Sequence, residues 1–281
     1  MADRDPVQPI HEPTVPLLVE EASWVHEAAD RFEDATAPEL LEWALAQFHP
    51  RMAISAAGGV DGMAILDMAW RINPSIRVFT LDTGRLPPET YALFEEIRER
   101  YGIQTEFEYP DTREVTELIT KEGPNLMYRG VDLRLACCNV RKVEPLKRKL
   151  ATLDAWVAGL RREQWASRKN IAKVELDREH GGIVKLNPLA DWTLDEVWDY
   201  VRTNEVPYHE LFDQGFTSIG CMPCTRPVLP GESERAGRWW WEEDTDKECG
   251  IHCSVGLLGT KSDRQKAIES ADGPASVRAG T

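Results

Sequence analysis

The stretch from Met52 to Arg71, MAISAAGGVDGMAILDMAWR, decides the fold of this chain. Its first four residues predict a short buried strand, and the apolar residues from Met63 onward have the spacing of a helix. Between them, residues 57–62 (AGGVDG) form a glycine-containing loop. A glycine loop that ends at the start of a helix can hold a phosphate group through backbone N–H groups. The stretch therefore predicts a strand, a phosphate-binding loop and a helix.

The same alternation continues along the chain. Further strands are predicted at residues 76–81, 104–109 and 155–160, and further helices at residues 88–101, 140–150 and 193–203. Alternating strands and helices indicate a parallel sheet with helices on both faces. The predicted fold class is α/β, with a mostly parallel, doubly wound sheet. Ligands of such sheets lie at the carboxyl ends of the strands.

The composition divides the chain into four parts. Residues 1–50 are predicted to be helical or loose, residues 51–215 to form the α/β part, and residues 261–281 to be a disordered tail. Residues 216–260 lack a regular pattern and are rich in Cys, Gly, Trp and charged residues, which indicates an irregular functional segment.

Charge and cysteine content restrict the kinds of partner. The net charge of −15 argues against a broad contact with nucleic acid or anionic lipid, so an anionic ligand needs a local basic pocket. The chain has no apolar stretch of the roughly 18–20 residues that cross a membrane, and its first residues do not resemble a secretory signal. We therefore expect a cytoplasmic protein whose six cysteines are ligands or catalysts. A homo-oligomer is compatible with this sequence, which does not specify the oligomeric state.

Four cysteines form two groups, Cys137-Cys138 and the CxxC motif of Cys221 and Cys224. Neighbouring cysteines cannot form a disulfide with each other without strain. Four thiolates suit a tetrahedral metal or a cubane cluster, and ligand type alone leaves zinc and iron–sulfur equally open. Unliganded cysteines or a redox CxxC are the alternatives. A redox CxxC normally opens a helix, whereas residues 225–227 (TRP) follow this one.

Residues 136–142 (ACCNVRK) resemble the CCxxRK motif of the adenylyl-sulfate (APS) reductases, a family of assimilatory sulfonucleotide reductases. The resemblance continues, in the same order, through residues 81–85, 159–164, 186–192, 218–226, 235–242 and 247–252. It implies a fold of the PP-loop type, like that of the adenine nucleotide hydrolases. It also implies a [4Fe–4S] cluster on Cys137, Cys138, Cys221 and Cys224.

The resemblance implies that Cys249 is the nucleophile. The matching cysteine attacks the sulfur of APS, releases AMP and becomes an S-sulfocysteine, which thioredoxin or a glutaredoxin-like dithiol reduces to liberate sulfite. Five acidic residues lie between positions 242 and 248, and their charge raises the pKa of a nearby thiol. We expect Cys249 to become a thiolate only when it docks beside a cationic pocket. No motif requires Cys253, which we interpret as an incidental thiol.

The resemblance also implies a set of substrate-binding residues. Basic candidates are Lys142, Arg161, Arg162, Arg235 and Arg238, which suit the oxygens of sulfate and phosphate. Backbone and loop candidates are Gly58, Gly59, Asp61, Leu81, Asp82, Thr83 and Gly84, and His252 completes the set. Asp82 suits a ribose hydroxyl or a role in fixing its own loop. We expect at least two of the tryptophans at 239–241 to serve in packing.

The glycine loop departs from the SGGxDS pattern of the PP-loop ATP pyrophosphatases, because Ala57 and Gly62 replace its two serines. The lost hydroxyls weaken an ATP-cleaving interpretation and a tRNA-thiolating one, which also needs a basic RNA-binding face. A zinc module for protein binding is a second rival.

Within the family, the paired cysteines are associated with APS more than with its 3′-phosphorylated relative PAPS. The predicted activity is thioredoxin-dependent reduction of APS, with PAPS as the alternative substrate. The family cluster tunes charge near Lys142 and does not pass electrons to the substrate.

Overall fold

The computed structural model describes residues 23–242 and residue 251, which include a six-stranded sheet in the order β3-β2-β1-β4-β6-β5. The strands are β1 (Met52–Ser55), β2 (Arg77–Leu81), β3 (Glu106–Glu108), β4 (Ala155–Val157), β5 (Val174–Asp177) and β6 (Ile183–Leu186). All neighbouring pairs are parallel except β5 with β6, which is antiparallel. The predicted mostly parallel α/β fold is confirmed.

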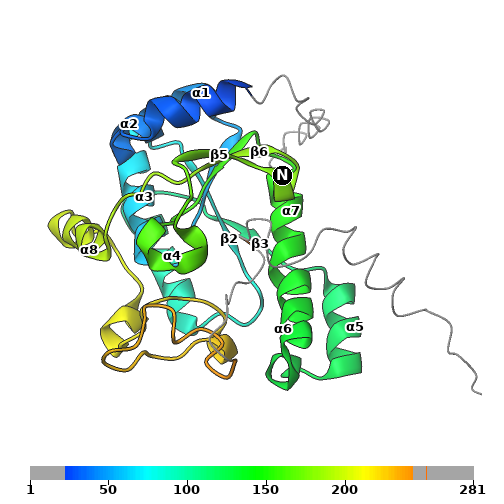
Figure 1. Cartoon of the computed structure of the whole chain (residues 1–281). Helices are drawn as coiled ribbons and strands as arrows, with labels where there is room; N and C mark the ends of the chain where they lie inside the picture. Colours follow the sequence, from blue (N-terminus) through cyan, green and yellow to red (C-terminus); the bar gives the residue numbers. More distant parts are fainter. Residues whose placement is uncertain (1–22, 243–250, 252–281) are drawn as a thin grey trace, which may run out of the picture.

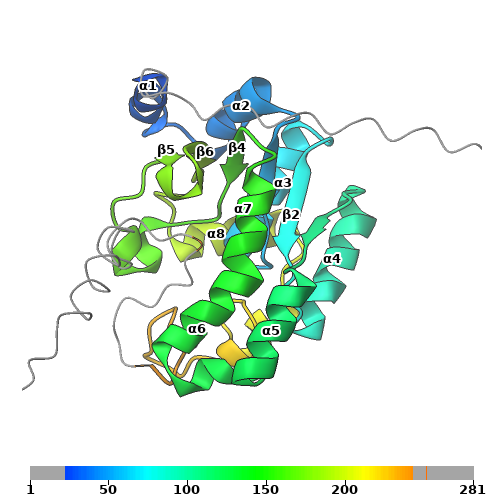
Figure 2. The same ribbon diagram turned by 90° about the vertical axis from the view of Figure 1, so that its right-hand side faces the viewer.

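Helices cover both faces of this sheet (Figures 1 and 2). One face carries α1 (Ser23–Phe32), α2 (Ala37–Phe48), α3 (Val60–Ile72), α4 (Pro88–Tyr101) and α8 (Leu194–Thr203). The other carries α7 (Glu144–Leu150), which continues from α6 (Val131–Cys138), and α5 (Thr112–Glu122) lies beside α6.

Strand β1 shows why the sheet is covered on both sides. Met52 and Ile54 belong to the larger apolar core, and Ala53 between them belongs to the core under α7. Because successive side chains of a strand point to opposite faces, one apolar strand supplies both cores.

A buried carboxylate joins three helices of the larger layer. Asp67 of α3 accepts hydrogen bonds from the hydroxyls of Tyr101 (2.9 Å) and Tyr200 (2.7 Å), and from Nε of Arg71 (2.6 Å). Burial and the Asp67 carboxylate raise the pKa of both tyrosines. These bonds connect α3 to α4 and α8 behind the glycine loop.

The predicted elements are present, with shifted bounds. Helix α3 starts at Val60, three residues earlier than predicted. Strand β3 keeps the central part of its predicted range, and β4 keeps the first half of its range. Helices α5 and α6 and strands β5 and β6 were not predicted. The predicted helix at 140–150 is a π-helical turn, Asn139–Val143, followed by α7.

The part of the C-terminal segment that the structure describes has little regular structure. From Gly215 to Glu242 it contains the 3₁₀ turn Met222–Cys224 and an isolated bridge between Thr225 and Arg238. The prediction of an irregular segment after residue 215 agrees with this. In the described ranges we found no helix with the length and apolar character needed to cross a membrane.

Candidate active site beside the carboxyl edge of the sheet

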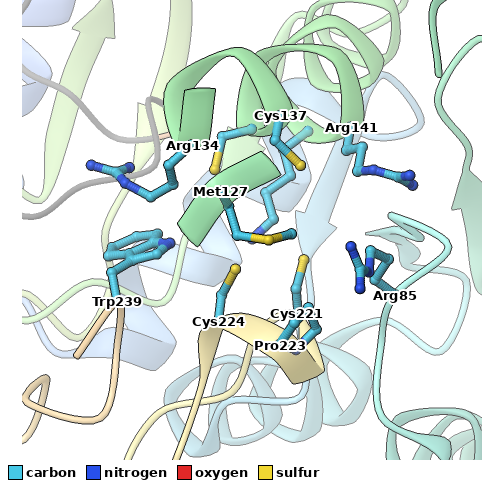
Figure 3. Close-up of a pocket in the computed structure, with 11 residues that line it drawn as sticks. Arg85, Met127, Arg134, Cys137, Arg141, Cys221, Pro223, Cys224 and Trp239 are labelled. Carbon is cyan, nitrogen blue, oxygen red and sulfur yellow. The ribbon is translucent and has the colours of Figure 1, made fainter. Parts of the chain in front are cut away.

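Four cysteine side chains line one cavity (Figure 3). Cys137 and Cys138 end α6. Cys221 directly precedes the turn Met222–Cys224, and Cys224 ends it; all four cysteines are buried and free. Among residues 23–242 and 251, no three His, Cys, Asp or Glu side chains are arranged to hold a single metal ion.

Local backbone geometry brings the two cysteine pairs to this cavity. The π-helical turn after Cys138 widens the helix directly beyond the first pair, and such turns are common at functional sites. The second pair is held by the Cys224 N–H, which donates to the Cys221 carbonyl (2.9 Å), and by the Met222 N–H, which donates to the Arg85 carbonyl (2.8 Å).

Basic side chains surround the thiols. Arg134, Arg141, Lys142 and Arg238 are each less than 10% exposed, and Arg85 also lines the cavity. Buried cations are stable only beside anionic or hydrogen-bonding groups. The cavity is therefore suited to a negatively charged occupant.

The thiol pKa values differ within the cavity. Burial raises the pKa of Cys137, and it raises the pKa of Cys224 to about 11. For Cys221 burial acts in the same direction, but Lys142 and the Thr83 hydroxyl outweigh it and lower the pKa. Occupation by a metal group releases the remaining thiol protons, because thiolate is the form that binds metals.

The loop after β2 connects the cavity to the edge of the sheet. Thr83 Oγ1 lies 3.2 Å from Cys221 Sγ, and the Thr83 carbonyl accepts a hydrogen bond from Arg141. Asp82 accepts bonds from the Gly84 N–H (2.8 Å) and the Tyr91 hydroxyl (3.0 Å). Of the two roles expected for Asp82, the structure shows the loop-fixing one. Leu81 ends the strand, and its side chain packs against the core under α7.

The glycine loop lies at the carboxyl end of β1. Gly58 has a φ of +83°, a conformation that favours glycine, and a Cβ at this position would lie 3.0 Å from the His209 ring. Gly59 is the N-cap of α3, and a Cβ there would meet nothing within 4 Å. A side chain at Gly59 would therefore have open space at the start of α3.

The predicted basic residues fall into two sets. Lys142 lines the cysteine cavity, Arg238 is buried close to Cys221 and Cys224, and Arg235 precedes Arg238 in the same segment. Arg161 is fully buried, with Asp61, Glu163 and Glu234 as its partners. Arg162 pairs with Glu33, beyond the end of α1. Arg161 and Arg162 thus have protein carboxylates as partners, and their contact with substrate stays a prediction.

Three predicted positions lie outside the described residues: Cys249, His252 and Cys253. Ile251 is described, and it packs, as Leu81 does, against the core under α7. Of the tryptophans, Trp239 is buried in the cysteine cluster and Trp241 packs against it, which confirms the expected packing role for two of them.

Sequence reasoning missed several residues of the cavity. Arg85 and Arg141 belong to the recognised motifs, but neither was selected as a site residue. Met127 and Arg134 lie in a region where no element was predicted. Their only signal was proximity in sequence to Cys137.

A mostly parallel α/β sheet with a glycine loop at its carboxyl edge, joined by the β2 loop to a cysteine cavity, defines an α/β protein with a cysteine-rich site. The phosphoadenosine phosphosulfate reductase domain matches residues 51–227, and the chain belongs to this family.

Relatives and one solved structure support the assignment. The chain is 45% identical to adenosine 5′-phosphosulfate reductase of Pseudomonas aeruginosa (strain LESB58), over 80% of this chain and 85% of the relative. It is 44% identical to the enzyme of that name from Allochromatium vinosum, over 78% and 85%. A crystal structure of phosphoadenylyl-sulfate (PAPS) reductase from Candida auris, a phosphate complex, matches with a TM-score of 0.62 and 30% identity, over 74% of this chain and 98% of that one.

Proposed function

We propose that this protein reduces adenosine 5′-phosphosulfate to sulfite and AMP in assimilatory sulfate reduction. The observation that carries the proposal is the contact between Thr83 Oγ1 and Cys221 Sγ, 3.2 Å apart. Because of this contact, the loop after β2 and the cysteine cavity form one continuous site. A nucleotide at the carboxyl edge of the sheet would place its sulfate beside the cavity.

A [4Fe–4S] cluster on Cys137, Cys138, Cys221 and Cys224 is part of this proposal. Four buried thiols that line one cavity supply the number and type of ligands that a [4Fe–4S] cluster needs. The buried cations around them would offset the negative charge of four thiolates. When bound, the cluster supplies a local charge that tunes the electrostatics near Lys142.

The residues around the cluster site are suited to bind and orient the anionic end of the nucleotide. Lys142 lines the cavity, and Arg238, buried close to Cys221 and Cys224, donates from Nη1 to the Ile219 carbonyl (2.6 Å). Within the described part of the chain, the buried Nε of Arg238 has no hydrogen-bond partner. An oxygen of sulfate or phosphate would satisfy this donor. Arg235 and the N–H groups after Gly58 and Gly59 are the further proposed contacts.

The chemical step in this proposal belongs to Cys249. Its thiolate attacks the sulfur of the bound nucleotide, the bond from sulfur to the bridging oxygen breaks, and AMP leaves with the electron pair. A dithiol protein of the thioredoxin type then supplies two electrons and becomes a disulfide. Sulfite leaves, and the Cys249 thiol is restored. Cytoplasmic location, homo-oligomer formation and the identity of the reductant stay predictions.

Anaerobic purification followed by an absorption spectrum, iron analysis and a sulfite-release assay tests the proposal. We expect a brown, iron-containing protein that releases sulfite from APS when thioredoxin is supplied. A colourless, iron-free protein would contradict the cluster assignment. The same assay with PAPS decides between the two nucleotides.

The nucleophile is tested with a matched pair of variants. Cys249→Ser should abolish sulfite release, whereas Cys253→Ser should retain it, because no recognised motif requires the second cysteine. Both variants should keep the iron content of the wild type. Sulfite release by the Cys249→Ser protein would refute the mechanism.

A further inference from the structure

Arg161 joins three separate parts of the chain through its guanidinium group. Its Nε donates to Oδ1 of Asp61 (2.5 Å) in the first turn of α3, and its Nη2 lies 3.1 Å from both carboxylate oxygens of Glu234. Its Nη1 donates to Glu163, which belongs to the same loop as Arg161. The donors of Arg161 therefore reach the glycine loop on one side and the C-terminal segment on the other.

The bridge is buried. The Arg161 side chain is 0% exposed, that of Asp61 10% and that of Glu234 20%, whereas that of Glu163 is 45% exposed. Breaking a buried ion pair leaves an uncompensated charge, but an exposed pair contributes little. The contribution of Arg161 to stability therefore comes mainly from its bonds to Asp61 and Glu234.

Neighbouring residues hold both ends of the bridge in place. The Gln164 amide donates to the other oxygen of Asp61 (3.0 Å), and the Thr217 hydroxyl donates to the backbone carbonyl of Glu234. Gly159 packs so closely on the start of α3 that a Cβ there would lie 2.9 Å from the Gly62 nitrogen. The bridge thus joins two fixed pieces of backbone.

The C-terminal segment has a second buried attachment, at the cysteine cavity. Nε of Arg134 lies 2.7 Å from Oε1 of Glu242, and the two side chains are 4% and 8% exposed. Arg235 and Arg238 lie between the two attachments in sequence, one and four residues after Glu234. The Arg161–Glu234 pair is thus the attachment next to Arg235, one of the proposed anion-binding arginines.

We propose that Arg161 and Glu234 are positioning residues, which fix Arg235 and Arg238 of the C-terminal segment at a set distance from the glycine loop. This inference rests on the proposed function, in which both regions contact the anionic end of one nucleotide. Arg161 then acts through Asp61 and Glu234 and need not contact the ligand.

The test compares Glu234→Gln with Glu232→Gln in the full-length protein isolated under anaerobic conditions. Glu232 is a matched control because it pairs with Arg226 inside the same segment (2.8 Å) and does not reach the α/β part through that pair. The probe is AMP, measured by calorimetry, together with KM and kcat for APS and the iron content. We expect Glu234→Gln to weaken AMP binding and raise KM by about tenfold while iron content is kept. Glu232→Gln should behave as the wild type.

Equal AMP affinity in the wild type, Glu234→Gln and Glu232→Gln proteins would overturn the inference. Failure of the wild type itself to bind AMP or to release sulfite would refute the proposed function instead. If Glu234→Gln does not fold, Glu234→Asp replaces it, because this variant keeps the charge and withdraws the carboxylate by one methylene group. An unchanged AMP affinity in that variant would equally overturn the inference.

Discussion

Gly237 shows how tightly the C-terminal segment packs at the scale of single residues. A Cβ on Gly237 would lie 2.2 Å from the Arg226 carbonyl oxygen, and the Gly237 carbonyl accepts the N–H of Arg226 (3.0 Å). A Cβ on Gly220 would similarly lie 2.3 Å from the guanidinium of Arg238. Glycine at these positions lets the chain fold back beside the cavity.

Gly237→Ala should therefore destabilise the protein by about 1–3 kcal/mol, because the new methyl group overlaps backbone that cannot move aside. Thermal unfolding followed by circular dichroism measures the effect. Gly231→Ala is the control: φ is +87° there, but a Cβ meets nothing within 4 Å, so only a backbone cost of about 1 kcal/mol is expected. An equal effect of the two substitutions would argue against the close packing.

His209 predicts a pH dependence of stability. Its ring is fully buried below Gly58, Nε2 lies 2.9 Å from Thr90 Oγ1, and Nδ1 accepts the Leu211 N–H. Burial lowers the pKa of His209 below its ordinary value of 6.5, although Glu89 opposes the shift. Below pH 6.5 the unfolded chain then binds a proton that the folded state does not, so stability falls as the pH falls.

We expect this histidine to remove up to about 1.4 kcal/mol between neutral pH and pH 5.5. Urea unfolding of the wild type and of His209→Gln at both pH values isolates the effect, because the acidic residues contribute equally to both proteins. If the free energy of unfolding fell equally with pH in the two proteins, the pH dependence would not come from His209.

At the scale of elements, two helices differ in what stabilises them. One is α5, and the other is α7, which forms one continuous helix with the π-helical turn and α6. Helix α5 has no fully buried residue, and its start depends on Asp111, whose carboxylate accepts the N–H groups of Arg113 (2.8 Å) and Glu114 (3.2 Å). Helix α7 buries Leu146 and Leu150 in the core. Capping therefore matters more for α5 than for α7.

Asp111→Ala should weaken α5 by about 1 kcal/mol without unfolding the sheet. Hydrogen exchange followed by mass spectrometry should show faster exchange in residues 113–122 and no change in the strands. Glu117→Ala, at an exposed position of the same helix, should leave that exchange unchanged. Faster exchange spread over the whole protein would mean that α5 is not an independent unit.

At the scale of the whole molecule, the cysteine cavity joins parts of the fold that are distant in sequence. Cys137 and Cys138 belong to α6 on one face of the sheet, and Cys221 and Cys224 belong to the irregular segment (Figures 1 and 3). A group bound by all four would cross-link these parts, as structural metal sites do.

Removal of iron by an anaerobic chelator should therefore lower the unfolding temperature, and protection from hydrogen exchange should fall in residues 131–143 and 217–242. The sheet should keep its protection, because its cores contain no cavity cysteine. Identical exchange with and without iron would refute the cross-link. Cys253→Ser, carried through the same treatment, should respond like the wild type.

Much of this architecture could be predicted from the sequence. The apolar residues of β1, the glycine loop and the helical spacing after Met63 are local patterns, and they were sufficient for a parallel α/β fold. Strands β5 and β6 were missed because their pairing is set by β4 and by the turn between them, not by a strong local pattern. Helix α5, with no fully buried residue, lacks a strong core signal.

The sequence by itself determined the strand–loop–helix unit at Met52–Arg71 and the two cysteine pairs, because both depend on residues that are neighbours in the sequence. Only the tertiary structure decided what the charged residues near them contact. The sequence predicts that Arg161 binds an anion. In the fold its guanidinium group does bind anions, but those that the structure describes are the carboxylates of Asp61, Glu163 and Glu234 of the protein itself. A guanidinium group binds a ligand phosphate and a distant carboxylate by the same forces, so only the position of each partner in space distinguishes the two.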